Sequence, residues 1–415
     1  MLARIGFRKI NYMLAVGLCV VFMAALPSCA QVARAQAGPA PASSDARGEG
    51  TDFSFYKPPQ DTTPYPLVRG SEVKNVVLLI GDGMGLGQVA LTRMTVAGMN
   101  GKLHMERMPI VGLMTTHPAN EVVTDSAAAA TAMACGIRTN NGVVGMDPAG
   151  TKYLTILEGA KHKGRSTGLV ATSAITHATP ACFGAHVRDR DNEVDIAKQL
   201  LENKVDVLLG GGRMFFLPGD RDGEREDGRN LIEEAKQAGY SYVESGDDLE
   251  DAQGPYLLGL LQDAELTTLE PEPTLAELAG KALEILSGNE SGFFLMVEGS
   301  QIDWACHDND TDNAIRQTLL FDEAVKVAMD FAIEDRETLV IVTGDHETGG
   351  LIAGTEKGSS GIRCSWSTGG HTAMPLPVYS FGPRAMDFVG VYDNTELSKK
   401  IADRLRIEPF PRAIE

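Results

Sequence analysis

Acidic and imidazole side chains follow three apolar runs of this 415-residue chain. Asp82 stands between two glycines after one run, and Asp345 and His346 stand together after another. The remaining run leads into two carboxylates and one imidazole, namely Glu298, Asp303 and His307. Carboxylate oxygens mixed with imidazole nitrogens are typical ligands of zinc and magnesium, so the pattern predicts a metal centre. Each group alone also fits a structural role, because aspartates cap helices and an acid four residues before a histidine can pair with it on a helix face.

A serine opens an alanine-rich segment with strong helix propensity. Ser126 follows Thr124 and Asp125 and precedes four alanines. A helix N-cap explains this pattern, because Ser and Asp are favoured caps and Ala is the best helix former. The same position suits a nucleophile, because the positive end of the helix dipole favours an alkoxide and an anionic substrate. The two roles are compatible.

Short apolar runs alternate with helical patterns from about residue 71 onwards. The expected buried strands are Val76–Ile80, Thr167–Thr172, Val205–Leu209, Phe293–Val297, Leu339–Thr343 and Pro377–Phe381. The expected helices are Gly85–Gly98, Ser126–Cys135, Asn192–Glu202, Asn230–Gly239, Pro273–Ser287 and Asp310–Ile333. The alternation predicts an α/β fold with a mostly parallel central sheet and helices on both faces. Ligands of such sheets bind beyond the carboxyl ends of the strands, where the polar groups would converge.

Composition and charge narrow the functional classes. The formal charge of −19 argues against a nucleic-acid-binding surface. Carboxylates that hold divalent cations are a second source of that charge, besides an acidic surface. Four cysteines lie beyond the N-terminal region and show no framework spacing. We expect either buried thiols or a single bridge among Cys135, Cys182, Cys306 and Cys364.

Residues 1–35 have the features of a secretory signal peptide. Basic residues precede an apolar run from about Met13 to Leu26, and small residues follow it. Two processing routes are open: a lipoprotein-type box that would place a lipid on Cys29, or ordinary cleavage after the Ala-Arg-Ala stretch at 33–35. No later run reaches the roughly twenty apolar residues of a membrane-spanning helix. We therefore expect export to the periplasm or medium, with or without an N-terminal lipid.

Two further regions follow the signal peptide. Residues 36–70 are rich in Ala, Gly, Ser, Pro and Asp, and we expect them to form a flexible arm or tether. The remaining residues, 71–415, are expected to form one folded domain.

Three segments together resemble the alkaline phosphatase family, and the resemblance extends from Asp82 to His371. They are Asp125-Ser126-Ala, the segment Val-Glu-Gly-x-x-Ile-Asp-x-x-x-His that ends at His307, and Thr-Gly-Asp-His at residues 343–346. The resemblance implies an exported bacterial phosphomonoesterase with an alkaline-phosphatase-like sheet, in which residues 71–415 form the catalytic domain. It implies hydrolysis of small phosphate monoesters through a phosphoserine at Ser126, with two zinc ions and one magnesium ion. Family habit also suggests a homodimer.

The resemblance assigns residues to each expected metal. It implies one zinc ion on Asp303, His307 and His371, and a second on Asp345, His346 and Asp82. The third metal, magnesium, would be held by Asp82, Thr179 and Glu298.

Two further positions are implied to handle the phosphate. Arg190 is expected to bind it and Asp125 to orient that arginine. Local periodicity does not separate Arg190 from Arg188, because residues two apart in an extended segment point to the same face.

Two positions depart from a pattern found in some bacterial members. His177 stands where those members carry an aspartate near the third metal, and Trp304 stands where some carry a lysine or histidine close to the phosphate. An imidazole is softer than a carboxylate and could favour zinc or cobalt over magnesium. Trp304 is either a substrate-binding or a packing residue.

Two alternatives to a phosphomonoesterase compete. A phosphodiesterase or nucleotide pyrophosphatase of the same superfamily shares the paired metals, but it usually has a threonine nucleophile and lacks the arginine clamp. A non-catalytic metal- or phosphate-binding protein explains the ligands but not the serine.

Overall fold

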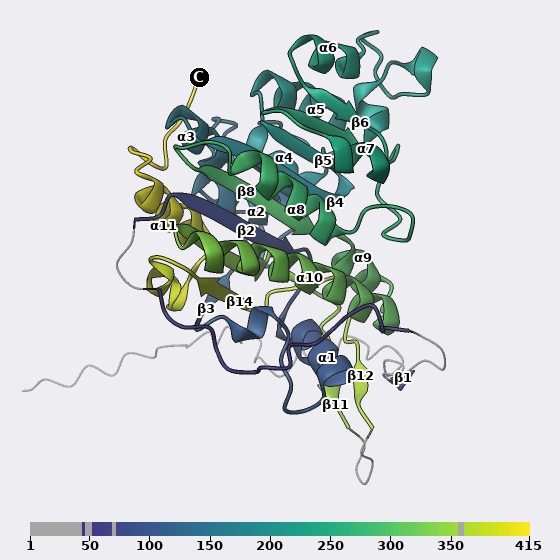
Figure 1. Cartoon of the computed structure of the whole chain (residues 1–415), viewed down its shortest axis with the longest axis vertical. Helices are drawn as coiled ribbons and strands as arrows, with labels where there is room; N and C mark the ends of the chain where they lie inside the picture. Colours follow the sequence, from purple (N-terminus) through teal and green to yellow (C-terminus); the bar gives the residue numbers. More distant parts are fainter. Residues whose placement is uncertain (1–43, 46–51, 69–71, 356–360) are drawn as a thin grey trace, which may run out of the picture. The chain divides into compact units, whose positions relative to one another are not determined.

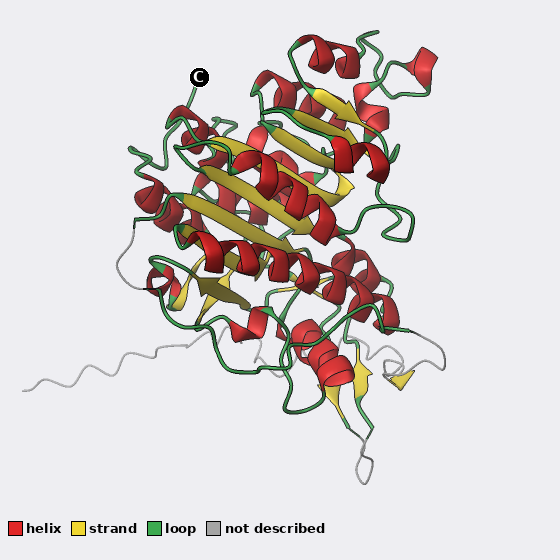
Figure 2. Cartoon of the chain, in the orientation of Figure 1, coloured by secondary structure: helices red, strands yellow, loops and turns green. Residues whose placement is uncertain are grey.

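A ten-stranded sheet forms the centre of this computed structural model, in the order β15-β3-β14-β9-β2-β8-β4-β5-β7-β6 (Figures 1 and 2). The structure describes residues 44–45, 52–68, 72–355 and 361–415, so the predicted signal peptide and Cys29 lie outside the described residues. The ten strands are β2 (Asn75–Gly81), β3 (Ile110–Thr115), β4 (Ser166–Ala174), β5 (Val207–Gly211), β6 (Ser241–Val243), β7 (Leu257–Leu260), β8 (Phe293–Gly299), β9 (Thr338–Gly344), β14 (Leu376–Phe381) and β15 (Gly390–Asp393).

The sheet is mostly parallel, as the sequence predicts. Strand β2 pairs in parallel with β8 and β9, and the parallel pairing continues outward from β8 to β6. Strand β14 is antiparallel to both of its neighbours, β9 and β3. Buried parallel strands are continuous apolar runs, and this explains why the central strands were predictable.

Helices cover both faces of the sheet, which confirms the predicted fold class. Successive residues of β2 point to opposite faces, so Val76 and Leu78 join one apolar core while Val77 and Leu79 join the other. The first core packs against α2 (Ser126–Cys135), α3 (Ile156–His162), α4 (Ala178–Gly184), α5 (Glu193–Glu202), α6 (Leu231–Gln237) and α11 (Thr395–Leu405). The second packs against α1 (Leu86–Ala97), α7 (Gly246–Asp251), α8 (Leu275–Leu286), α9 (Gln301–His307) and α10 (Thr311–Asp335). Figure 1 shows α8 and α10 crossing the near face of the sheet.

Smaller elements complete the described part of the chain. Short strands are β1 (Ser44–Asp45), β10 (Glu347–Thr348), β11 (Ile352–Gly354), β12 (Arg363–Ser365) and β13 (His371–Thr372). Single 3-10 turns span Met105–Arg107, Arg213–Phe216, Gly219–Arg221 and Ala385–Phe388.

Part of the expected arm packs on the domain. In the described segment 52–68, the Tyr56 side chain is buried and its hydroxyl donates a hydrogen bond to Asp322 Oδ2 at 2.6 Å. The four cysteines of the described chain are all buried, and no disulfide joins any two of them. Among the described residues, no helix combines the length and apolarity required to cross a membrane.

Candidate active site

Three adjacent strands deliver carboxylates to one edge of the sheet. Gly81 at the end of β2 lies in register with Gly299 of β8 and with Gly344 of β9. Asp82, Glu298 and Asp345 therefore reach the same carboxyl edge, and all three are fully buried. The predicted convergence at the strand exits is thus found in the structure.

The α9 helix supplies the next two expected ligands directly after β8. Asp303 Oδ2 lies 3.3 Å from His307 Nε2, because the two residues are one helical turn apart. The turn after β2 packs tightly on this helix at Gly83, which has a positive φ and where a Cβ would lie 2.8 Å from Asp303 Cα. His371 of β13 comes from far along the chain, and its Nε2 lies 3.1 Å from His307 Nε2.

The ligand atoms gather into overlapping groups. In each group, the carboxylate oxygens and imidazole nitrogens lie within 4.8 Å of one another. The groups among the described residues are Asp303 with His346 and His371, Asp82 with Asp345 and His346, and Asp82 with His177 and Glu298. Asp82 is shared by two of these groups and His346 by two.

The donor set fits metal ions, because several of its buried polar atoms make no hydrogen bond. These atoms are both carboxylate oxygens of Asp82, Asp345 Oδ2, Glu298 Oε1, Thr179 Oγ1 and His177 Nδ1. Buried polar groups are normally hydrogen-bonded, so a cluster of buried polar atoms without hydrogen bonds indicates a site for an ion. A cation would satisfy the carboxylate oxygens, which can only accept when ionised.

Burial and neighbouring charges shift the pKa values of the site carboxylates. Burial, together with the charges of Asp345 and Asp303, raises the pKa of Asp82 well above its usual range. Burial also raises the pKa of Glu298, to about 7. Burial alone would raise the pKa of Asp303, but the hydrogen bond from His307 and the charges of the nearby imidazoles outweigh it and lower that pKa. A divalent cation would add nearby positive charge of the same kind. It would thereby favour the ionised forms of Asp82 and Glu298.

Hydrogen bonds at the Nδ1 atoms orient the rings of His307, His346 and His371. Carbonyl oxygens accept from the Nδ1 atoms of His307 and His371, at 2.7 Å from Gly369 and 2.8 Å from Thr124 respectively. Both rings therefore carry a proton on Nδ1, so Nε2 is the atom that each would offer to a metal ion. On His307 that ion would replace the proton donated to Asp303. Because the Thr348 hydroxyl donates to Asp303 Oδ1, its oxygen accepts from His346 Nδ1 at 3.1 Å.

Ser126 occupies the first position of α2, which has the same bounds as the predicted helix. Asp125 is its N-cap, and its Oδ1 accepts from Ala128 N at 2.9 Å. Ser126 Oγ lies 3.2 Å from His346 Nε2, so the serine borders the ligand groups. In the structure, Asp125 is the N-cap and Ser126 lies at the positive end of the helix dipole.

The two candidate arginines point to different places. Arg190 is half-buried, and its Nη1 donates to Asp125 Oδ2 at 3.2 Å. Arg188 is exposed, and its Nη2 donates to the carbonyl of Ala149. Burial alone would lower the pKa of Arg190, but the charges of Asp125 and Asp82 outweigh burial and raise it.

His177, the N-cap residue of α4, lies between the arginine and Trp304. Its Nε2 is 3.1 Å from Arg190 Nη2, and its ring meets the Trp304 indole edge to face with centroids 6.1 Å apart. Burial and the charge of Arg190 lower the pKa of His177 to about 3, so the imidazole is neutral. Thr179, two residues further on, is fully buried.

Comparison with known proteins gives the family. The family model described as alkaline phosphatase matches residues 73–364. Alkaline phosphatase 3 of Bacillus subtilis is 37% identical over 421 residues, which cover 81% of this chain and 89% of that protein. The alkaline phosphatase of Escherichia coli is 34% identical, with 78% and 84% covered. This chain belongs to the alkaline phosphatase family.

Solved structures agree with this membership. The alkaline phosphatase from the Antarctic bacterium TAB5 is 36% identical, with a TM-score of 0.75 and coverage of 81% of this chain and 99% of that one. A histidine-to-aspartate variant of that enzyme has Mg bound in its M3 site; it is 35% identical, with a TM-score of 0.72 and the same coverage. As a member of the alkaline phosphatase family, the present chain is a phosphomonoesterase that binds metal.

Several residues around this alkaline phosphatase site were not predicted from the sequence. Ser300 Oγ donates to Glu298 Oε2 at 2.8 Å and leaves the other oxygen without a partner. Asn141 Oδ1 accepts from Asp125 N at 2.9 Å, and Thr348 joins Asp303 to His346. The only sequence signal for Ser300 and Thr348 was a hydroxyl two residues after a predicted ligand. Asn141 had no such signal, because it approaches from a separate loop.

Proposed function

We propose that the chain hydrolyses phosphate monoesters in two displacements, through a phosphoserine at Ser126. The position of Ser126 carries the proposal, because its Oγ lies 3.2 Å from His346 Nε2 at the N-terminus of a ten-residue helix. A serine aimed at ligand groups explains turnover, whereas a protein that only binds metal or phosphate needs no such residue.

The proposed metals are two zinc ions and a third ion. Asp303, His307 and His371 would hold one zinc, and Asp345 and His346 the second together with Asp82. The third ion, magnesium or a softer metal, would lie between Asp82, Thr179 and Glu298, with His177 beside it. The unpartnered oxygens of Asp82, Glu298 and Asp345 support this allocation. When bound, zinc supplies Lewis acidity that withdraws charge from phosphate oxygens and lowers the pKa of the serine hydroxyl.

Three side chains have separate roles in the first displacement. Arg190 binds the nonbridging oxygens of the phosphate through its guanidinium fork, and Asp125 fixes the orientation of that fork. Ser126 gives up its hydroxyl proton as Oγ attacks phosphorus, and the bond to the alcohol oxygen breaks on the opposite side. The departing alcohol oxygen takes up one proton, so the proton lost by the serine is balanced. The N-terminus of α2 favours the negative charge that gathers there.

The second displacement regenerates the enzyme. Water attacks the phosphoserine from the side that the alcohol vacated, and the bond between Oγ and phosphorus breaks. One proton of the water returns to Ser126, and inorganic phosphate leaves. Two inversions give net retention of configuration at phosphorus. Trp304, whose indole meets the His177 ring, is proposed to contact the substrate.

Ser126→Ala tests the proposal. The variant should lose most turnover of an aryl phosphate at alkaline pH and retain its zinc, measured by elemental analysis, because the serine is not assigned as a ligand. Incubation of wild type with labelled phosphate and acid quenching should trap one labelled phosphoserine, which the variant lacks. Near-normal turnover by the variant would contradict the covalent route. Hydrolysis of a diester faster than its matched monoester would favour a phosphodiesterase instead.

The third metal site is proposed to depend on His177. An imidazole favours softer ions than a carboxylate does, and the related Antarctic enzyme binds Mg in its M3 site when a histidine is replaced by aspartate. His177→Asp should therefore raise the magnesium content at the expense of zinc or cobalt. An unchanged metal profile by elemental analysis would place His177 outside the metal shell.

We also propose export and, from family habit, a homodimer. The basic and apolar pattern of residues 1–35 supports a signal peptide. Mass spectrometry of the exported protein should find either a lipidated Cys29 or Gln36 as the first residue. An intact N-terminus on exported protein would contradict both routes. Light scattering coupled to gel filtration tests the dimer, and a monomeric mass would refute it.

A further inference from the structure

Two short segments next to the phosphate-handling residues are joined side by side. Val144 N donates to the Val187 carbonyl at 3.0 Å, and Val187 N donates back to the Val144 carbonyl at 3.1 Å. Arg190 N donates to the Gly142 carbonyl at 2.9 Å. We call residues 142–145 and 186–190 the arginine clip.

One end of the arginine clip holds the proposed phosphate-binding groups. Gly142 N donates to Asp125 Oδ2 at 2.9 Å, and the same carboxylate oxygen accepts from Arg190 Nη1. The backbone of the clip thus fixes the backbone of Arg190. It also fixes the Asp125 carboxylate with which the arginine side chain pairs. Any slip between the two segments would move the guanidinium relative to Ser126.

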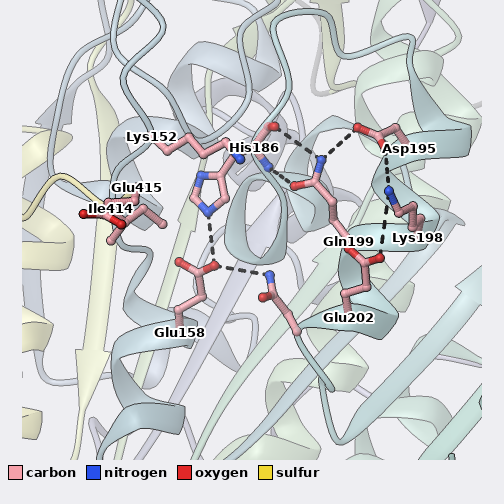
Figure 3. Close-up of a pocket in the computed structure, with 10 residues that line it drawn as sticks. Lys152, Glu158, His186, Asp195, Lys198, Gln199, Glu202, Ile414 and Glu415 are labelled. Carbon is pink, nitrogen blue, oxygen red and sulfur yellow. Dashed lines mark hydrogen bonds and ion pairs between the residues drawn. The ribbon is translucent and has the colours of Figure 1, made fainter.

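The other end of the arginine clip is fastened by a buried histidine. His186 Nδ1 lies 2.8 Å from the Gly145 carbonyl. Its Nε2 lies 3.0 Å from Glu158 Oε1, a contact that Figure 3 shows. A carbonyl and a carboxylate both act as acceptors, so each ring nitrogen of His186 faces an acceptor. His186 is 6% exposed and Glu158 is 8% exposed, so both contacts are buried.

Glu158 is held as an acceptor by other donors as well. Thr155 N donates to its Oε2 at 2.9 Å, and Asn203 Nδ2 donates to its Oε1 at 3.2 Å. Burial alone would raise the pKa of Glu158, but the hydrogen bond and charge of His186 outweigh it and lower that pKa. The lowered pKa favours the ionised carboxylate, which accepts from all of these donors.

The contact at Gly145 leaves no room for a side chain. Gly145 has a φ of +64°, and a Cβ there would lie 2.4 Å from the Ala185 carbonyl oxygen and 2.5 Å from His186 Nδ1. Gly145 N donates to Thr131 Oγ1 at 2.9 Å, and Thr131 belongs to the helix that Ser126 opens. The glycine thus links the histidine to the nucleophile helix.

From this chain of contacts we infer that His186, held between the Gly145 carbonyl and Glu158, is a positioning residue for Arg190. Its contact with Gly145 fixes that end of the arginine clip, and the paired backbones transmit the register to Gly142, Asp125 and the guanidinium. The inference rests on the proposed role of Arg190 in binding phosphate. Among the described residues, the hydrogen-bond partners of His186 are Gln199, Gly145 and Glu158, so His186 acts on the arginine through the clip.

The test is a double-mutant cycle between His186→Gln and Arg190→Ala. We expect His186→Gln alone to lower kcat/KM for an aryl phosphate about tenfold and to weaken phosphate inhibition by the same factor, because a misplacement of 1 Å can cost roughly a hundredfold. In the Arg190→Ala background, His186→Gln should change neither quantity further. Thermal unfolding of each variant is measured in parallel.

Two further variants keep the test decisive. Glu158→Gln retains the side-chain shape but removes the counter-charge, so it should give a smaller loss of the same kind even where His186→Gln fails to fold. Lys198→Ala is the matched control. Lys198 lines a cavity of about 390 Å³ together with His186 and Glu158, but it pairs with Asp195 and Glu202 on its own helix. It should leave kcat/KM and phosphate inhibition unchanged.

The outcomes distinguish a failure of the positioning role of His186 from a failure of the proposed role of Arg190. Equal losses from His186→Gln in both backgrounds would show a general structural role and overturn the positioning role. Normal kinetics for both His186→Gln and Glu158→Gln would overturn it as well. Should Arg190→Ala itself leave kcat/KM and phosphate inhibition unchanged, the proposed function of Arg190 would fail instead.

Discussion

Thr348→Val should weaken zinc binding although Thr348 is not assigned as a ligand. The Thr348 hydroxyl donates to Asp303 and accepts from His346 Nδ1, so one side chain fixes an expected ligand of each zinc. Thr348 and His346 are fully buried and Asp303 is 5% exposed, so water cannot easily replace the lost partner. Valine keeps the shape of threonine but offers His346 no acceptor.

The expected size of the effect follows from these contacts. A buried donor left without its acceptor costs about 1–3 kcal/mol. Loss of an outer hydrogen bond to a metal ligand typically costs about 10- to 100-fold in affinity, equivalent to about 1.4–2.8 kcal/mol. The two estimates agree, so we expect zinc affinity to fall by 10- to 100-fold.

Competition with a chromophoric chelator measures this loss directly. Thr348→Ser is the matched control, because it keeps the hydroxyl and should bind zinc nearly as wild type does. Excess zinc should restore most of the activity of Thr348→Val. Wild-type zinc affinity in Thr348→Val, or an equal loss in both variants, would refute the reasoning.

Three other predictions concern separate parts of the molecule. Arg190→Ala should lower kcat/KM about 10- to 100-fold, since charged hydrogen bonds contribute about 1.5–3 kcal/mol, and should weaken phosphate inhibition; a larger effect of Arg188→Ala on both would mean that the assignment is shifted by two residues. The pKa of Glu158 in the folded protein lies below its ordinary value of 4.5, so its pairing with His186 stabilises the fold above that value and is lost as pH falls through the lowered pKa. Urea unfolding at a series of acidic pH values should therefore show a shallower loss of stability for Glu158→Gln than for wild type, and parallel curves would contradict this. Chelation should abolish activity and lower the thermal midpoint, with both restored by stepwise return of zinc and then magnesium; activity that survives exhaustive dialysis against chelator would rule out the metal mechanism.

The sequence predicted the centre of the sheet better than its edges. Central strands such as β2 and β9 are continuous apolar runs, whereas β3 alternates in burial and contains Gly112, so it was missed. The reversed direction of β14 was also not predictable, because an apolar run carries no information about strand polarity. The helix α2 was predicted at its true bounds because an N-cap, an alanine run and a terminal glycine agree there.

The site shows a similar division. The expected ligands could be named from their residue types and from the family resemblance, and the structure gathers them at one edge. The residues that hold them, such as Ser300 and Asn141, could not be predicted, because a lone serine or asparagine is common on any surface. Their roles depend on which segments the fold brings together.

The order of ligands along the chain has a consequence for biosynthesis. Asp82 leaves an early strand, Asp345 follows a late one, and His371 comes after both. The zinc proposed for Asp303, His307 and His371 cannot bind a partly synthesised chain tightly, since its ligand set is incomplete until His371 has been made and docked. Loading of that ion is therefore expected only after His371 has docked beside Thr348. We expect the metal supply of the compartment in which folding ends, rather than that of the ribosome's surroundings, to determine which ion fills that site.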